Sequence, residues 1–338
     1  MRTALVTGGT GFIATRLVPA LLDDGWEVRT CGRRPRPDSL PEAADHRQAD
    51  LAGDDDLAPL FDGVTHLFHL AGASSSQSSQ EEMERSNVDG TARLLAAAPD
   101  GQLERAMYMS STSVYGEEVQ LPVPVTEDVE PRPSRGYGKA KWQAEQVVWD
   151  HGRKGLPVTV LRPVSVHGPG SIKLLASVIL DVAIERHAGN TRLPVPEPAI
   201  EQRLVHVDDL VGACLHLAGH DGAVGRAFNV VSGVYPSSHE IAGLVAAEFE
   251  MEVDVVDHPD AGPSHDERAE VRERMLAEGM EPHILLTEDR FRFMRKANRN
   301  NRLSIDALLG TGFRPARADV ATAVSTDVAW YRDHRWVI

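Results

Sequence analysis

Blocks of apolar residues recur along the first seventy positions of the chain. The run Thr3–Thr7 predicts a short strand, and the large apolar residues over 12–22 follow the 3.6-residue period of a helix. Two further apolar runs, Trp26–Cys31 and Thr65–Leu70, predict the next strands. The N-terminal part of the chain is therefore expected to alternate between strand and helix.

The alternation continues to about residue 161. Arg105–Met109 and Leu156–Leu161 are strand candidates, and each is preceded by a helical pattern, at Ser86–Ala98 and Tyr137–His151. Strands separated by helices pair in parallel through right-handed crossovers. The pattern predicts an α/β fold built on a doubly wound parallel sheet.

The pattern is less regular after Gly170. The charged stretch 257–302 favours helix over strand, and we expect it to lie over a substrate site. The other elements expected here are a helix at Ser171–His187, a proline-rich loop at Leu193–Ile200, a helix reached through Arg203–Val207 and ending at Leu217, and a strand at Ala227–Val231.

Composition and charge exclude several classes of protein. The chain has 338 residues, of which 42% are hydrophobic and 25% charged, which is typical of globular proteins. No apolar run reaches the length of about 18 residues that a membrane span needs. With 35 Lys and Arg against 50 Asp and Glu, the net charge of −15 argues against a nucleic-acid partner. The first residues lack the pattern of an export signal, so we expect a cytoplasmic protein that acts on a small molecule.

The residues that usually bind metals are scattered. Cys31 and Cys214 lie among apolar residues and form no CxxC pair, which favours two small buried hydrophobic residues in a reducing compartment. None of the 14 His residues falls in an HExxH motif, and His66 and His69 would point to opposite faces of one strand. The sequence predicts no metal site.

A glycine-rich loop separates the first predicted strand from the first helix, with the sequence TGGTGFIA at 7–14. Gly8 allows a tight turn and Gly11 lets the backbone approach a pyrophosphate. Phe12 and Ile13 begin the helix, whose N-terminal N–H groups attract phosphate. A glycine-rich turn without a ligand is the alternative, but the position between strand and helix favours a dinucleotide and a Rossmann-type fold.

The end of the second strand distinguishes the two nicotinamide dinucleotides. NAD-binding proteins usually place a carboxylate there, but this chain has Arg33 and Arg34. Two guanidinium groups can hold a 2′-phosphate, which favours NADP over NAD; the alternative is a solvated surface turn. Asp50 and Leu51 follow the next loop, where the acid can accept from the adenine amino group.

Tyr137 and Lys141 are four residues apart on a predicted helix and therefore share a face. An ammonium group near a phenol lowers the pKa of the phenol from about 10. Tyr137 can then exchange a proton with an alcohol or ketone while a cofactor exchanges hydride. The pair follows the sequence SSTSVYG at 110–116, which contains Ser111.

With these motifs the chain resembles the extended short-chain dehydrogenases/reductases, which include nucleotide-sugar epimerases, dehydratases and ketoreductases. The segments occur in the family's order through most of the chain. Besides those already quoted, they are HLAG at 69–72, NVDGT at 87–91, YGKAK at 137–141, LRPVSVHGPG at 161–170, HVDD at 206–209, GRAFNVVSG at 225–233 and GTGFRP at 310–315.

The resemblance implies roles for individual residues. Ser111 would bind the substrate carbonyl, Tyr137 would be the general acid/base, and Lys141 would lower the pKa of Tyr137 and contact the nicotinamide ribose. It also implies a homodimer formed by the helices at Ser86–Ala98 and Tyr137–His151. The other implied cofactor contacts are Leu70, Ala71 and Gly72 beside the dinucleotide, and Pro163 and Val166 beside the nicotinamide.

Several positions depart from the family pattern. Ala14 replaces the last glycine of the loop, a conservative change. Thr112 and Ser113 stand where similar dehydratases carry Asp-Glu, so dehydration is not expected. Ser165 and His167 replace the Asn and Tyr of nucleotide-sugar enzymes, which argues against a nucleotide-sugar substrate.

Substrate contacts are expected from Ser111, Thr112, Ser165, Arg203 and Arg292. Arg203 precedes a helix in the region that lines the substrate cleft of similar enzymes. Arg292 belongs to the basic and aromatic stretch from 290 to 302, which can meet a phosphate or carboxylate. The simpler alternative is a solvated helix face that pairs with the acidic segment from 266 to 278.

The sequence thus predicts an NADP-dependent oxidoreductase that reduces a ketone. An epimerase acting through a transient keto intermediate is the alternative, and a non-catalytic NADP-binding sensor is a second one. Residues 1–170, joined again by 205–233, are expected to form the NADP-binding domain. Residues 171–204 and 234–338 are expected to form a smaller, mostly C-terminal substrate-binding domain.

Overall fold

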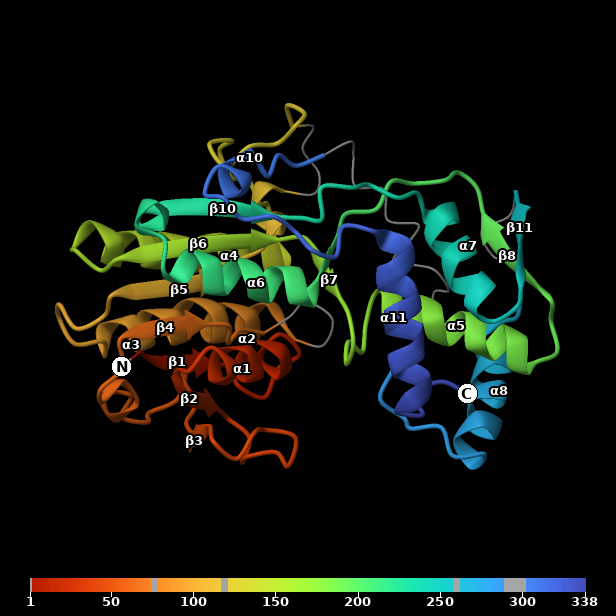
Figure 1. Ribbon diagram of the computed structural model, residues 1–338, viewed down its shortest axis with the longest axis horizontal. Coiled ribbons are helices and arrows are strands. Elements are labelled where there is room, and N and C mark those ends of the chain that lie inside the picture. The colour runs from red at the N-terminus through yellow and green to blue at the C-terminus, as the bar shows by residue number, and fades with distance from the viewer. Residues whose placement is uncertain (1, 74–77, 117–120, 258–261, 289–301) are drawn as a thin grey trace. The chain divides into compact units, whose positions relative to one another are not determined.

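The computed structural model describes residues 2–73, 78–116, 121–257, 262–288 and 302–338. The chain divides into two compact units, each assembled from separate stretches of sequence (Figure 1). The first unit comprises Met1–Val164, Asp208–Val231 and Asn301–Pro315, and the second comprises Ser165–Val207, Ser232–Asn300 and Ala316–Ile338.

This division differs from the one expected from the sequence at 165–170, 205–207, 232–233 and 301–315. Residues 301–315 join the first unit because Val125 donates its N–H to the carbonyl of Arg302 at 2.7 Å and accepts from Ser304 at 2.9 Å. Residues 165–170 join the second unit, where their strand has its hydrogen-bonded partner.

The first unit contains a parallel sheet of seven described strands, in the order β10-β6-β5-β4-β1-β2-β3 (Figure 1). This confirms the predicted doubly wound, Rossmann-type sheet. The strand order reverses at β1 and β4, and ligands of such sheets bind outside the carboxyl ends of the strands at this switch point. The strands are β1 (Thr3–Thr7), β2 (Glu27–Gly32), β3 (Asp45–Gln48), β4 (His66–His69), β5 (Arg105–Met109), β6 (Val158–Pro163) and β10 (Arg226–Val230).

Helices follow most of these strands, as parallel pairing requires. Leu5, Leu67 and Val160 are at most 1% exposed, because a sheet that packs on both faces buries apolar side chains on both. No helix in the described part of the chain is both long and apolar enough to cross a membrane. The helices are α1 (Ala14–Asp23), α2 (Gln80–Glu84), α3 (Gly90–Ala96), α4 (Gly136–Arg153), α6 (Val207–Ala218) and α10 (Asp306–Leu309), with short turns η1 (Ala58–Phe61), η2 (Arg85–Asp89), η3 (Thr112–Tyr115) and η4 (Asp221–Ala223).

The second unit has its own apolar core around α5, in which Ile179 and Val182 are fully buried. Arg268 is buried in this unit, where it contacts Asp181 at 2.9 Å and donates to the carbonyl of Thr287 at 2.9 Å. The elements are α5 (Leu175–His187), α7 (Ser238–Glu248), α8 (His265–Ala277), α11 (Val320–Asp333) and two parallel strand pairs, β7 (Ser165–His167) with β9 (Leu204–His206) and β8 (Arg192–Pro196) with β11 (Glu252–Val256).

Some element predictions were wrong. The stretch expected as a loop at Leu193–Ile200 begins with the last four residues of β8, because pairing with β11 satisfies the backbone of this strand despite two prolines. The helix expected from Ser171 begins at Leu175. The sequence also missed β3, β11 and α11; β3 reads Asp-His-Arg-Gln and has no apolar period to reveal it.

Both cysteines are buried free thiols, as predicted. Burial, reinforced by Asp55 and Asp50, raises the pKa of Cys31 to about 11. Burial alone raises the pKa of Cys214 to about 12. Both side chains therefore act as small apolar groups at neutral pH.

Candidate active site

The glycine-rich loop between β1 and α1 turns tightly against the chain that follows β4. Gly8 has a φ of +69°, and a Cβ atom there would lie 2.9 Å from the backbone nitrogen of Ala71. Gly11 donates to the carbonyl oxygen of Gly8 at 2.8 Å and is itself exposed. No described side chain caps α1 at Ile13. Thr15 and Arg16 in its first turn donate their N–H groups to the carbonyls of Gly11 and Ile13, at 3.1 and 3.2 Å, so the N–H groups left to an anion are those of Phe12 and Ile13 just before the helix.

The loop after β4 lies against this turn. Ala71 donates its N–H to the hydroxyl of Thr7 at 3.3 Å, and that hydroxyl is 2.7 Å from Nδ1 of His69. Nε2 of His69 is 2.8 Å from the hydroxyl of Thr91. Burial lowers the pKa of His69 to about 3, so a neutral imidazole links β1, β4 and α3. These bonds hold Leu70–Gly72 beside the glycine-rich loop.

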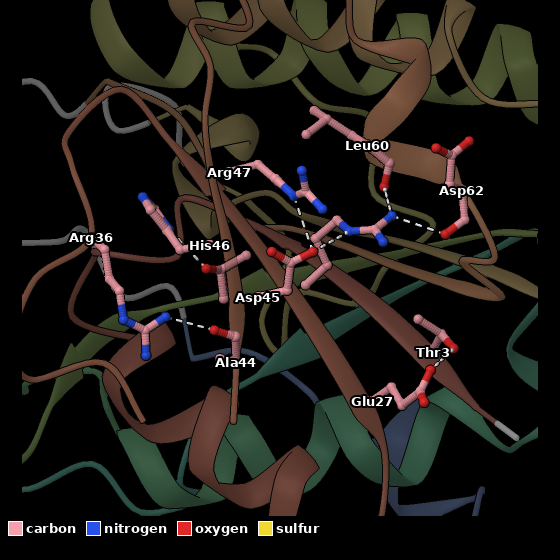
Figure 2. Close-up of polar contacts among 11 residues, drawn as sticks. Thr3, Glu27, Arg36, Ala44, Asp45, His46, Arg47, Leu60 and Asp62 are labelled. Atoms are coloured by element: carbon pink, nitrogen blue, oxygen red, sulfur yellow. Dashed lines mark hydrogen bonds and ion pairs between the residues drawn. The ribbon is translucent and has the colours of Figure 1, made fainter. Parts of the chain in front are cut away.

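The end of β2 carries Arg33 and Arg34, and both residues are exposed. Within the described residues, neither guanidinium has a hydrogen bond or an ion pair, so both are available to an anion. The neighbouring Arg29 is engaged with the Asp45 carboxylate instead. Arg36 and Arg47 are likewise engaged, with the carbonyl of Ala44 and the carboxylate of Asp45 (Figure 2).

Asp50 and Leu51 form the next loop. Oδ1 of Asp50 accepts the N–H of Ala52 at 3.0 Å, so one carboxylate oxygen closes a turn. Leu51 is 8% exposed, and its carbonyl accepts from Arg93 at 2.7 Å. The loop is thus fixed, and the expected bond from Asp50 to an adenine amino group stays a prediction.

Tyr137 and Lys141 lie on the first turns of α4. Lys141 is 4% exposed, and its Nζ donates to the carbonyl oxygen of Met109 at 2.8 Å. The same Nζ lies 5.9 Å from the centroid of the Tyr137 ring and 4.9 Å from that of Tyr108. The sequence did not identify Met109 and Tyr108, because β5 reads only as an apolar strand.

The loop after β5 meets the start of α4 in the same unit. The hydroxyls of Ser111 and Ser113 are 2.6 Å apart, and the hydroxyl of Thr112 donates to the carbonyl of Pro163 at 3.4 Å. A Cβ atom on Gly138 would lie 2.4 Å from the carbonyl oxygen of Ser113, so only glycine lets α4 pack so closely on this loop. The structure therefore brings the predicted serine loop and the Tyr137 helix together.

The charge state of Tyr137 differs from the prediction. Burial raises the pKa of Tyr137 to about 12, whereas the sequence analysis expected Lys141 to lower it. Burial also lowers the pKa of Lys141 to about 8, against the opposing effect of Glu145. The ammonium is directed to the carbonyl of Met109, so the loss of water around the phenol outweighs any attraction between the two groups. Tyr137 therefore keeps its proton at neutral pH.

Asn87 supplies a further polar group at this place. It lies in the π-helical turn η2, a distortion that often marks functional sites, and is 1% exposed. Its amide donates to the carbonyl of Ala73 at 3.1 Å, but its buried Oδ1 has no hydrogen-bond partner among the described residues. A Cβ atom on Gly72 would lie 2.3 Å from this oxygen and 3.2 Å from Nζ of Lys141. Oδ1 of Asn87 is thus a buried acceptor without a described partner, near the Lys141 ammonium and the exposed Gly72. A bound ligand that carries a hydroxyl group would satisfy it.

The remaining substrate and cofactor candidates are not in this group. Ser165 and Val166 are half-buried on β7, and Arg203 is half-buried just before β9, all in the second unit. Arg292 lies outside the described residues, as does most of the basic stretch around it. Their predicted roles stay predictions.

His167 and His206 are buried partners of a carboxylate in the second unit. Nδ1 of His167 lies 2.8 Å from Asp327, and Nε2 of His206 lies 3.4 Å from it. Burial disfavours the carboxylate, but the two imidazoles outweigh this and hold the pKa of Asp327 below its usual value. This gives His206 a structural role and makes His167 a core residue.

The doubly wound sheet and the grouping of Ser111, Tyr137 and Lys141 match the pattern of the extended short-chain dehydrogenases/reductases. The model of the NAD dependent epimerase/dehydratase family matches residues 4–231, and the chain belongs to that family. Its relatives include proteins named as reductases, dehydrogenases and epimerases.

Two curated relatives illustrate this range. The chain is 35% identical over 180 residues to a putative dihydroflavonol 4-reductase of Synechocystis, a match that spans only 50% of each chain. It is 31% identical over 318 residues to a UDP-glucose 4-epimerase of Mycolicibacterium smegmatis, covering 85% of this chain and 96% of that one.

Solved structures show the same fold at lower identity. RMD from Pseudomonas aeruginosa complexed with NADPH has a TM-score of 0.73 at 22% identity, covering 98% of this chain and 100% of that one. The UDP-glucose 4-epimerase of Thermus thermophilus complexed with NAD also has a TM-score of 0.73 at 22% identity, covering 98% and 99%.

Proposed function

We propose that the protein is an NADP-dependent oxidoreductase that reduces the carbonyl group of a small molecule. The observation that carries the proposal is the meeting of the Ser111 loop with the helix of Tyr137 and Lys141 in one unit. A bound nicotinamide would supply the hydride to the carbonyl carbon. The chain's own residues handle the carbonyl oxygen.

Tyr137 donates its phenolic proton to that oxygen, while the hydroxyl of Ser111 donates a hydrogen bond to it. With a pKa of about 12, the phenol is protonated at neutral pH and is ready to act as an acid. Lys141 and Oδ1 of Asn87, which has no hydrogen-bond partner among the described residues, would hold a ribose hydroxyl beside Tyr137.

The preference for NADP rests on Arg33 and Arg34. Both are exposed, and neither has a partner in the described residues, so a 2′-phosphate would meet two available guanidinium groups. The glycine-rich loop and the uncapped start of α1 would hold the pyrophosphate.

An epimerase is the second candidate. It would use the same groups to oxidise a carbinol and then return the hydride to the other face. The match to the Mycolicibacterium smegmatis UDP-glucose 4-epimerase, which covers most of this chain, favours it. A sensor that binds NADP without chemistry would have no need of the proton donor Tyr137.

The remaining parts of the proposal concern setting and assembly. The second unit would supply substrate contacts, including Ser165 and Arg203, and Val166 would border the nicotinamide. Helices α3 and α4 would form the interface of a homodimer, as in similar proteins. A cytoplasmic location fits the two buried free thiols, since the cytosol keeps cysteines reduced.

The first test is to denature freshly purified protein and identify any nucleotide that it releases. A reductase should be nearly empty, bind NADPH more tightly than NADH, and oxidise NADPH when offered a panel of carbonyl compounds. Stoichiometric oxidised cofactor would instead support the epimerase. Tight NADPH binding without turnover on any carbonyl would support the sensor.

A further inference from the structure

The edge strand β3 presents different side chains on its two faces. Its four residues, Asp45–Gln48, pair in parallel with β2, so alternate side chains point to opposite sides of the sheet. On one face Asp45 accepts from Arg29 at 3.1 Å and from Arg47 at 3.0 Å. Figure 2 shows Arg47 and the Asp45 carboxylate turned toward each other, with His46 pointing away from them.

His46 and Gln48 occupy the other face. Both contact the backbone of the loop after β2 that carries Arg33 and Arg34, which we call the arginine loop. Nε2 of His46 lies 3.0 Å from the carbonyl oxygen of Arg34, and Nε2 of Gln48 donates to the carbonyl oxygen of Arg33 at 3.0 Å. Nδ1 of His46 lies 2.8 Å from the hydroxyl of Thr30. A neutral imidazole with its proton on Nε2 satisfies both contacts, donating to Arg34 and accepting from Thr30.

The rest of this loop is closed by Arg36. Its guanidinium donates to the carbonyl oxygens of Leu40 at 3.1 Å, Pro41 at 2.6 Å and Ala44 at 2.6 Å. Figure 2 shows the bond from Arg36 to Ala44. Arg36 is thus committed to the backbone and is not available to a ligand.

The same support extends to the glycine-rich loop. A Cβ atom on Gly9 would lie 2.5 Å from Cβ of Thr30, so this loop rests directly on the residue that contacts His46. Gly9 also donates its N–H to the carbonyl of Cys31 at 3.1 Å. Thr30 therefore contacts the glycine-rich loop directly and is linked to the arginine loop through His46.

We infer that His46 and Gln48 are positioning residues for recognition of the 2′-phosphate of NADP. This inference rests on the proposed cofactor preference. The two side chains hold the carbonyls of Arg33 and Arg34 and leave the guanidiniums exposed and unpaired by other described residues. Fixing the backbone before binding reduces the entropy lost when the arginines meet the phosphate.

The test compares NADP+ and NAD+, which differ only in the 2′-phosphate, in equilibrium binding to the full-length protein. His46→Ala and Gln48→Ala should each lower the preference for NADP+ by about two- to tenfold, the worth of one hydrogen bond, and leave NAD+ affinity nearly unchanged. His46→Gln, whose amide can still donate, should recover part of the preference.

Arg47→Ala is the matched control. It removes a cation from the same strand, but this side chain is bound to Asp45 on the opposite face, so the preference for NADP+ should hold. An equal loss in Arg47→Ala would mean that the preference responds to any change in β3 and not to the bonds that reach Arg33 and Arg34, and would overturn the positioning role. Gln48 is exposed, so its variant keeps the test valid even if His46→Ala unfolds.

Arg33→Ala with Arg34→Ala separates this inference from the proposed function. If that double variant keeps the wild-type preference, the proposed 2′-phosphate site itself is wrong. If it loses the preference while His46→Ala and Gln48→Ala keep it, only the positioning role is wrong. Adding His46→Ala to the double variant should have no further effect on the preference, and a further loss would contradict an action through the arginines.

Discussion

Arg162 and Glu145 form a buried, two-point ion pair between the end of β6 and the middle of α4. Nη2 of Arg162 lies 2.7 Å from Oε2, and Nε lies 3.1 Å from Oε1. The two side chains are 4% and 0% exposed, and Ser110 also donates to Glu145. Because Glu145 is one helical turn beyond Lys141, the pair fixes the helix that carries Tyr137 to the sheet.

Replacement of Glu145 by Ala should lower the free energy of unfolding by about 3–5 kcal/mol, because it leaves a guanidinium buried without its counter-charge. Urea unfolding measures the change. Glu145→Ala combined with Arg162→Met removes both charges and should recover much of the loss. Equal losses in the single and double variants would show that packing, not the unpaired charge, causes the instability.

Gly8→Ala should destabilise the first unit by roughly 2–3 kcal/mol, because it adds a strained backbone and a Cβ atom 2.9 Å from Ala71. Gly25→Ala is the control: Gly25 has a φ of +75° and nothing within 4 Å of its Cβ position, so only strain of about 1–2 kcal/mol applies. Equal losses in the two variants, measured by urea unfolding, would exclude the close approach as a cause.

The sequence predicts those parts of the fold that depend on local pattern. β1, the glycine-rich loop and α1 follow one another within 3–23, and period and glycine spacing reveal them. β3 has no apolar period, so its place at the sheet edge depends on pairing with β2, which the local pattern does not specify. Side chains alternate between the two faces of a strand, but that His46 and Arg47 lie on opposite faces of the sheet can be stated only once the pairing of β3 is known.

The site is predictable to a similar extent. Motifs identified Ser111, Tyr137 and Lys141, because four-residue spacing on a helix is a local property. The bond from Lys141 to the carbonyl of Met109 depends on which strand packs against α4. Every residue has a backbone carbonyl, so the sequence does not indicate which of them accepts this bond. The direction of the pKa shift of Tyr137 was mispredicted for the same reason, because the burial that raises this pKa depends on the fold of the whole unit.

Tyr137→Phe should reduce turnover by about 10²–10⁴-fold, the usual contribution of a positioned acid, and leave NADPH affinity unchanged. The variant keeps the ring and removes only the hydroxyl that donates the proton. Turnover under saturating NADPH, together with binding measured by cofactor fluorescence, separates the two effects. Unchanged turnover would remove Tyr137 from the proton transfer, and lost affinity would point to a binding role.

Lys141→Met should alter the dependence of stability on pH. The pKa of Lys141 falls from 10.5 to about 8 on folding, mainly because the ammonium loses water. Between these values the unfolded chain binds the proton and the folded chain does not, so the lysine makes the fold more stable as pH rises from about 8 to 10.5. Below a pH of about 8 Lys141 is protonated in both states, so this gain in the free energy of unfolding is absent and the buried ammonium destabilises the fold.

The free energy of unfolding of the wild type, minus that of Lys141→Met, should therefore increase with pH across this window, by up to about 3 kcal/mol, and be flat below it. Urea unfolding at several pH values measures the difference. Lys139→Met on the same helix is the control: the Lys139 side chain is 44% exposed, so its difference from the wild type should stay flat. If the Lys141→Met difference is flat as well, Lys141 keeps an ordinary pKa in the folded protein. Its ammonium would then be more hydrated than its exposed fraction of 4% implies.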